Sequence, residues 1–193
     1  MPPAKAACMA HPLGHTRSTV QRDHALIAPD SHVPSPIAGW SGATAHILIS
    51  PRCGAEFSEI LVDLERGGRI GLPQPAVSRF VWVREGAVTL RAAGKAHELG
   101  PSSYAFLPPD AEHTLTARRR SKIALIEKPY VSAFEVREPR IVVGDERKVK
   151  GTPLGGDPNL IVKVLLPDDP SFDMAVNTMA FAPGAALALT EVH

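Results

Sequence analysis

Short apolar runs separated by turn residues dominate the middle of the chain. Several of them have the length of β-strands: 46–50, 59–65, 80–83, 87–91, 104–107 and 122–127. In the second run Ile60, Val62 and Leu64 alternate with a mixed set of residues, and this period of two gives the strand one fully apolar face. Glycine and proline mark the turns, and no helical periodicity of useful length interrupts the pattern. The chain is therefore predicted to form an all-β barrel or sandwich.

The two flanks of this region have a different pattern. Residues 1–40 are rich in Pro, Ser, His and Ala and predict an extended N-terminal arm. After residue 131 the strand pattern is lost while charge, Gly and Pro increase, and it resumes with runs at 160–166 and 173–181 before a Pro183-Gly184 turn. We therefore expect four segments: an arm at 1–40, a first barrel at 41–131, a linker at 132–159 and the beginning of a second barrel at 160–193.

Composition narrows the functional classes. The 193 residues include 21 Lys and Arg against 20 Asp and Glu, so no net field favours nucleic acid or an anionic membrane. Two cysteines, Cys8 and Cys53, are too few for a disulfide framework or a thiolate zinc site. No signal peptide or membrane span is predicted. We expect a cytoplasmic enzyme or binding protein that binds neither nucleic acid nor membrane, with the basic run at 118–122 in a solvated loop.

The last residues carry the first candidate chemistry. Glu191 and His193 lie two positions apart, so on a β-strand their side chains project to the same face. A carboxylate and an imidazole directed at one point supply half of a metal site. The alternative is a solvated pair of polar residues near a chain terminus.

The two halves of the chain repeat a strand, a glycine turn and a further strand in the same order. In the first half the spacing of Gly67, Pro73, Pro75, Arg79 and Gly86 resembles the first motif of the cupin superfamily, in which a Gly, a His-x-His pair, a Glu and a Gly stand at these separations. Two prolines and an arginine replace three metal ligands, and none of the three can bind a cation. The first barrel is therefore predicted to be metal-free.

The second cupin motif, Pro-x-Gly-x-x-His, is matched by Pro108 and His113, with Asp110 where the glycine would stand. A single imidazole cannot hold a labile divalent ion. His113 is accordingly predicted to be a core or pocket histidine in preference to a metal ligand.

Longer segments narrow the resemblance. The stretches 23–40, 48–51, 80–86 and 172–184 together resemble the bicupin (S)-ureidoglycine aminohydrolase family, and the likeness extends over nearly the whole chain. Its most specific parts are His-Val-x-Ser-Pro-x-x-Gly-Trp, which begins at His32, and Phe-Asp-Met-x-Val-Asn-Thr-Met, which begins at Phe172. The resemblance implies a cupin barrel of the double-stranded β-helix (jelly-roll) type, followed by the start of a second.

The resemblance also implies an activity and a cofactor. The family hydrolyses (S)-ureidoglycine to (S)-ureidoglycolate and ammonia in allantoin breakdown, with Mn²⁺ held by Glu, His, His and Gln in the second barrel. Glu191 and His193 match the first two ligands, and the sequence has no counterpart of the other two. We therefore expect a chain that ends within its second barrel, with a partial metal site that binds Mn²⁺ weakly and activity reduced accordingly.

Further expectations concern substrate and assembly. Asn177 is polar within an apolar run, so it is a candidate contact for a small ureido substrate, or else a hydrogen-bonded strand residue. Unpaired strand edges in the second half predict a homo-oligomer or poor solubility. Two other functions compete with the aminohydrolase: a non-catalytic cupin that acts as a binding or assembly module, and a different cupin enzyme such as an isomerase or dioxygenase.

Overall fold

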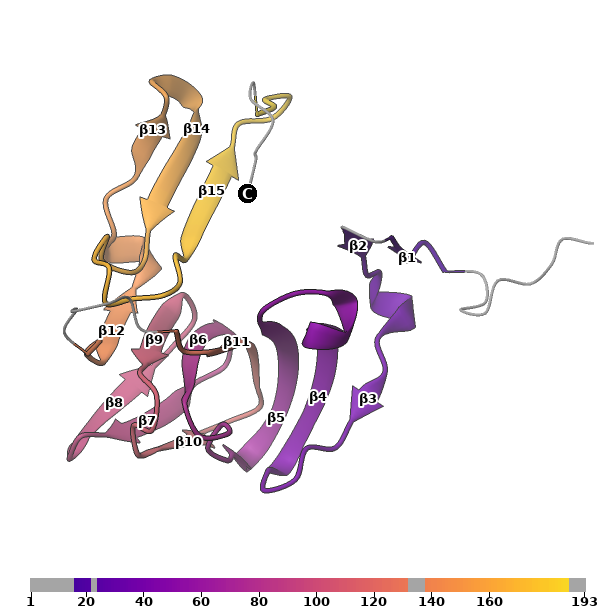
Figure 1. Cartoon of the computed structure of the whole chain (residues 1–193), viewed down its shortest axis with the longest axis vertical. Helices are drawn as coiled ribbons and strands as arrows, with labels where there is room; N and C mark the ends of the chain where they lie inside the picture. The colour runs from indigo at the N-terminus through magenta and orange to yellow at the C-terminus, as the bar shows by residue number, and fades with distance from the viewer. Residues whose placement is uncertain (1–15, 22–23, 132–137, 188–193) are drawn as a thin grey trace, which may run out of the picture.

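Strands make up almost all regular structure in the computed structural model, which describes residues 16–21, 24–131 and 138–187 (Figure 1). The strands are β1 Thr19–Val20, β2 Ala25–Leu26, β3 Pro34–Ser35, β4 Ser41–Ile49, β5 Ser58–Ile70, β6 Val77–Glu85, β7 Val88–Ala92, β8 Lys95–Leu99, β9 Ser103–Leu107, β10 His113–Ala117, β11 Ser121–Pro129, β12 Val142–Asp145, β13 Thr152–Leu154, β14 Asp157–Val164 and β15 Asn177–Phe181. Single 3-10 turns occur at η1 Pro29–Ser31, η2 Pro51–Cys53 and η3 Glu146–Lys148. The predicted all-β fold is confirmed. None of the helical turns in these ranges has the length or apolar character needed to cross a bilayer.

A ten-stranded antiparallel sheet forms a nearly closed barrel. Its strand order is β12-β9-β6-β11-β5-β10-β7-β8, and β4 pairs with β5 while β3 pairs with β4. Alternation along each strand directs one set of apolar side chains inward, where Val62, Val81, Leu90, Leu115 and Leu125 are at most 1% exposed. The predicted inward face of 59–65 is therefore correct.

The outer face of the barrel carries a second apolar core. Phe80 and Phe106 of the barrel pack with Leu165, Leu166 and Phe172 from the segment between β14 and β15. Polar contacts join the same two parts, because the Lys128 ammonium donates to an Asp173 carboxylate oxygen at 2.5 Å and the Tyr130 hydroxyl donates to the Ser171 carbonyl at 3.1 Å. In Figure 1 a three-stranded second sheet, β13-β14-β15, projects from this junction, and β1 and β2 form a separate two-stranded sheet.

The predicted repeat is present in the strand register. Pairing Ser35↔Ala45 between β3 and β4 recurs between β13 and β14 as Thr152↔Val162, each residue 117 positions later. The pairs between β4 and β5, Ala43↔Leu64, Ala45↔Val62 and Ile47↔Ile60, recur at the same offset as Leu160↔Phe181, Val162↔Met179 and Val164↔Asn177. The unit β13-β14-β15 is thus a second copy of β3-β4-β5.

The turns obey the same repeat. Gly39 and Gly156 both have positive φ, 80° and 86°, and so do Gly67 and Gly184, 79° and 81°. Left-handed backbone of this kind is accessible to glycine without a steric penalty. Gly39 and Gly156 therefore allow equivalent turns just before β4 and β14, whereas Gly67 bends the chain within β5 and Gly184 follows the end of β15. The 3-10 turn η1 likewise recurs as η3 at the same offset.

The segment 132–159 departs from the expected strand-free linker. It contains β12, η3 and β13, and β14 begins at Asp157. β12 adds to the edge of the barrel sheet, where Val142 pairs with Phe106 and Gly144 with Tyr104. A Cβ at Gly144 would overlap the Tyr104 ring, so only glycine allows the two strands to pair this closely. The same glycine is one of the residues that make the segment look like a loop in the sequence. In the expected arm, 1–40, the described part holds β1, β2, η1 and β3 with extended backbone between them.

Other strands also differ from the sequence prediction. β8 and β10 were not predicted, because Lys95-Ala-His-Glu-Leu99 and His113-Thr-Leu-Thr-Ala117 each contain too few apolar residues to stand out. The run expected at 173–181 forms a strand only from Asn177, since residues 173–176 belong to the junction with the barrel. Of the basic run 118–122, predicted to be a solvated loop, residues 118–120 lie exposed between β10 and β11. The last two, Ser121 and Lys122, already belong to β11, and Ser121 is buried.

Candidate functional site

A buried arginine lies at the centre of a cluster of polar groups at the end of the barrel where β5 ends and β6 and β10 begin. Arg79 on β6 is 1% exposed. Its Nε and Nη2 donate to Glu127 Oε1 on β11 at 2.8 and 2.6 Å, and its Nη1 donates to the Gly71 carbonyl at 2.8 Å. Nη1 also lies 3.0 Å from Nε2 of His113 on β10. The guanidinium therefore connects β6 with the neighbouring strand β11, with β10 and with the loop that follows β5.

The partners of His113 define its protonation. Its Nδ1 lies 2.7 Å from the Ala111 carbonyl, which can only accept, so Nδ1 carries the proton. Its Nε2 faces a guanidinium, which can only donate, so Nε2 presents its lone pair. Burial lowers the pKa of His113, and the nearby Arg79 charge acts in the same direction against the Ala111 hydrogen bond and Glu127. The ring is neutral, and the prediction of a buried pocket histidine is confirmed.

The positive charge of Arg79 is balanced by the carboxylate of Glu127. Burial lowers the pKa of Arg79, while the charge and hydrogen bond of Glu127 raise it. Because an arginine stays protonated in proteins, the pair consists of a buried cation and a carboxylate that is 19% exposed. A neutral His113 adds no charge, so the cluster as a whole is neutral.

The prolines of the motif lie in the loop between β5 and β6, next to this cluster. Pro73 is half-buried and Pro75 is exposed, and neither offers a donor atom to an ion. Asp110, which stands where the motif has glycine, adopts φ 57° and accepts a hydrogen bond from the Ala76 amide at 3.1 Å. Aspartate tolerates left-handed backbone better than most residues, so this replacement keeps the turn and connects the two loops.

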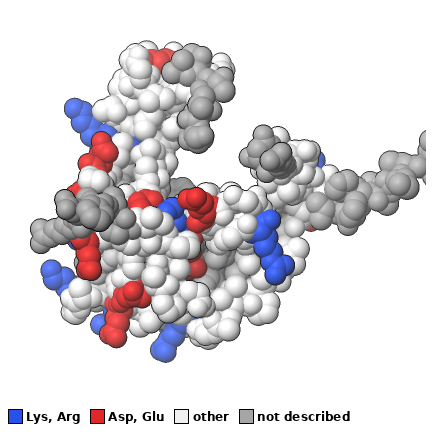
Figure 2. Space-filling model, in the orientation of Figure 1, with Lys and Arg blue, Asp and Glu red and all other residues white. Residues whose placement is uncertain are grey.

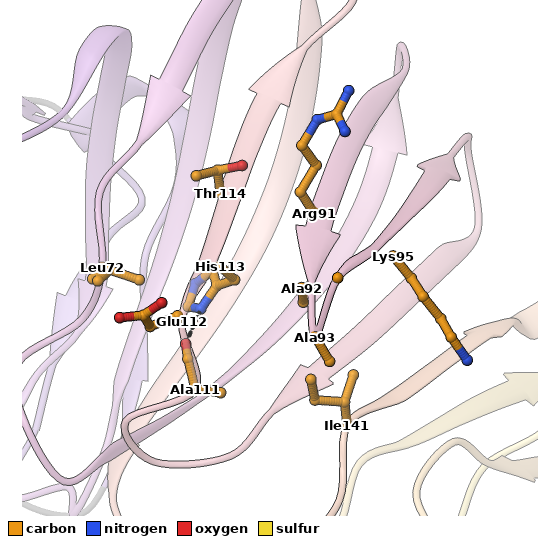
Figure 3. Close-up of a pocket in the computed structure, with 11 residues that line it drawn as sticks. Leu72, Arg91, Ala92, Ala93, Lys95, Ala111, Glu112, His113, Thr114 and Ile141 are labelled. Atoms are coloured by element: carbon orange, nitrogen blue, oxygen red, sulfur yellow. Dashed lines mark hydrogen bonds between the residues drawn. The ribbon is translucent and has the colours of Figure 1, made fainter.

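A cavity of about 790 Å³ opens beside His113. Figure 3 shows Leu72, Glu112 and His113 on one side and Arg91, Ala92 and Lys95 on the other. Arg79 is not among its lining residues. The cavity therefore exposes one edge of the imidazole, while the guanidinium behind it stays closed off.

The candidate residues of the second half are placed only in part. Glu191 and His193 lie outside the described residues. Asn177 begins β15, is exposed and lines a cavity of about 400 Å³ between the barrel face and the second sheet. Its register partner is Val164, so it shares a face with Met179 and Phe181. In the described ranges no three His, Cys, Asp or Glu side chains gather as metal ligands, and the barrel cluster has a guanidinium at its centre. The described residues thus do not fit a metal ion.

Strand parity could have revealed the Arg79 cluster. Arg79 shares its face of β6 with Val81 and Val83, and Glu127 shares its face of β11 with Leu125. Opposite charges at inward positions of two strands indicate a buried ion pair. The carbonyl partners, Gly71 and Ala111, leave no such signal in the sequence.

Comparison with solved structures supports the fold. The structure is similar to that of protein Ylba from E. coli, with a TM-score of 0.79 and 30% identity over 90% of this chain and 70% of that one. It is also similar to a putative glyoxylate induced protein from Pseudomonas aeruginosa, with a TM-score of 0.82 and 24% identity over 95% of this chain and 72% of that one. The barrel and its repeated strand unit place the protein among the cupins.

Curated relatives narrow this class. The chain is 35% identical to a probable (S)-ureidoglycine aminohydrolase of Oryza sativa subsp. japonica, over 93% of this chain and 58% of the relative. It is 31% identical to the (S)-ureidoglycine aminohydrolase of Escherichia coli, over 88% of this chain and 66% of the relative. The protein belongs to the (S)-ureidoglycine aminohydrolase family. It spans about 60% of the length of the plant relatives, and the scan against family models found no match.

Proposed function

We propose that this chain acts in the hydrolysis of (S)-ureidoglycine to (S)-ureidoglycolate and ammonia. The observation that carries the proposal is the identity of 35% over 93% of the chain to proteins named for this activity. In the reaction the bond between the central carbon and its amine nitrogen breaks, a bond to a water oxygen forms, and the amine leaves as ammonia after taking up a proton. The proposed substrate is a small ureido acid. Figure 2 shows acidic and basic side chains interspersed on the visible face, without the single-sign patch that a large charged partner would require.

The repeat supports a role for the second half. Asn177 is the counterpart of Ile60, which points into the first barrel and is 6% exposed. Ile60 is opposite Leu125, one inward position from Glu127 in the Arg79 cluster. By this correspondence Asn177 faces the same side of its strand as Ile60 does in the first unit. It would lie one inward position away from the place in the second unit that corresponds to the Arg79 cluster. Its amide can accept from the ureido N–H groups or donate to the substrate carboxylate.

The proposed cofactor is Mn²⁺, with Glu191 and His193 as its ligands in this chain. Carboxylate oxygen and imidazole nitrogen are donors that suit Mn²⁺. The proposed setting is a cytoplasmic homo-oligomer, which fits the open outer strands β13 and β15 of the described second sheet.

Ammonia release tests the proposal directly. The purified chain is incubated with Mn²⁺ and fresh (S)-ureidoglycine, and ammonia is measured above the rate without protein. Expected results are a Mn²⁺-dependent rate, its loss in Glu191→Ala and His193→Ala, and a reduced rate in Asn177→Ala. Met179→Ala, on the same face, serves as the matched control. No ammonia above background, with no Mn²⁺ bound, would instead favour the second candidate.

That second candidate is a non-catalytic cupin that serves as a binding or assembly module. The observation in its favour is that Glu127, the Gly71 carbonyl and His113 all direct their acceptor atoms at the Arg79 guanidinium. These partners are held by the guanidinium, so in this arrangement they are not available to bind a ligand of their own.

A further inference from the structure

The groups around Arg79 have the chemistry of metal ligands. His113 directs the lone pair of Nε2 at the guanidinium, and Glu127 and the Gly71 carbonyl direct oxygens at it. The far nitrogen of His113 donates to a backbone carbonyl at 2.7 Å, the type of contact that orients metal-binding histidines. Imidazole, carboxylate and carbonyl therefore converge on one buried positive charge.

We propose that the Arg79 guanidinium is the resident cation of the first barrel, and that its partners form a divalent metal site once residue 79 becomes a ligand. A guanidinium attached to β6 cannot dissociate, so the barrel keeps its cation whatever the supply of metal. It joins β6, β10, β11 and the loop after β5, the segments that a bound ion would join.

One substitution would convert the site. In Arg79→His the shorter side chain vacates the space of the guanidinium and adds a second imidazole. His113, Glu127 and the new side chain then supply the two-histidine, one-carboxylate set that binds divalent first-row metals with open positions. Contacts of 2.6 to 3.0 Å around the guanidinium would shorten to about 2.0–2.2 Å around an ion, a movement within the reach of side-chain adjustment.

Cobalt absorption tests this proposal without any reference to enzymatic activity. All proteins carry His193→Ala, so that the candidate ligand pair of the second half cannot supply the signal. On titration with Co²⁺, Arg79→His is expected to develop visible absorption bands that saturate at one ion per chain, and its Tm is expected to rise with Co²⁺. The parent with Arg79 and the variant Arg79→Met are expected to show neither effect. Adding His113→Phe to Arg79→His is expected to remove the bands.

Two results would overturn the proposal. One is a folded Arg79→His protein with no cobalt bands, and the other is a parent protein that binds one Co²⁺ per chain through His113. If Arg79→His does not fold alone, it is refolded with Zn²⁺. Recovery of the native circular dichroism that requires both Zn²⁺ and His113 supports the site, and failure to recover counts against it.

Discussion

The two copies of the repeated strand unit have the same register in opposite surroundings. In the first copy Leu64 is 2% exposed, because the barrel closes over it. Its counterpart Phe181 pairs with the equivalent residue of β14 yet is 45% exposed. The register of such a unit is therefore set by its own turns and pairing, with Gly39 and Gly156, and Gly67 and Gly184, at equivalent places. Barrel closure adds burial to a unit whose geometry is already specified.

The segments that precede the two units differ more. β2, which precedes the first unit, pairs with β1, whereas its counterpart β12, which precedes the second, pairs with β9 in the barrel sheet. The same position in the repeat thus contributes to a local hairpin in one case and to the edge of another sheet in the other. The partner available to the segment decides its role.

The largest difference between the copies is expected at the inward positions. Leu64→Ala should lower the free energy of unfolding by about 3 kcal/mol, because it leaves a cavity in a closed core. Phe181→Ala at the equivalent position should cost less than about 1 kcal/mol, since the side chain is already half exposed. Urea unfolding followed by tryptophan fluorescence measures both. Equal costs would show that the second unit is as closed as the first.

Arg79 comes next in expected effect. Arg79→Met leaves Glu127 and His113 without their shared partner, and should destabilise the first barrel by about 3 kcal/mol. Arg120→Met is the control, because its guanidinium is 84% exposed in a long ion pair with Glu65, and it should cost less than about 0.5 kcal/mol. If both variants unfolded at the same urea concentration, the cluster would have no structural role.

Pairing of β12 with β9 can be weakened at one residue. Gly144→Ala places a methyl group into the Tyr104 ring and should cost about 2 kcal/mol, detected by chemical denaturation. Gly100→Ala is the matched control: its Cβ would meet nothing within 4 Å, so its stability should stay within about 0.5 kcal/mol of the parent. A neutral Gly144→Ala would mean that the edge accommodates the methyl group by moving.

The smallest expected effect is a pH dependence from His113. Its folded pKa lies below its ordinary value of 6.5, mainly because of burial, so the unfolded chain binds the proton more readily. This contribution to stability is fully present above about pH 6.5 and decreases as the pH falls below it, by at most about 1.4 kcal/mol per pH unit. His113→Gln should flatten the curve between pH 7 and 5. An unchanged slope in that variant would exclude His113 as its source.

Much of this fold follows from the sequence, since period-two alternation identifies the inward faces of β5, β6 and β11. The strands that escape prediction do so for physical reasons. β8 and β10 have few apolar residues because only part of each faces the core, and β12 has a glycine because it must approach Tyr104 closely. Local composition does not carry information about a partner strand that is distant in the chain.

The candidate site is likewise only partly predictable from the sequence. The motif spacing identifies Arg79 as a replacement for a metal ligand and His113 as the histidine that the motif retains, and the structure brings both into one cluster. The motif spacing does not point to Glu127, although this residue lies at an inward position of a predicted strand. The proposed metal ligands Glu191 and His193 stay a prediction, as does the role of Asn177 toward substrate.

The pairing of β12 with β9 has a consequence for the nascent chain. β9 leaves the ribosome well before residues 142–145, so its outer edge stays open while the barrel core and the following segment are synthesised. An unpaired strand edge of a partly folded chain can pair with another chain and start aggregation. Slow translation between β11 and β12 would lengthen this interval. Rapid translation of the same region would let β12 cover the edge of β9 sooner.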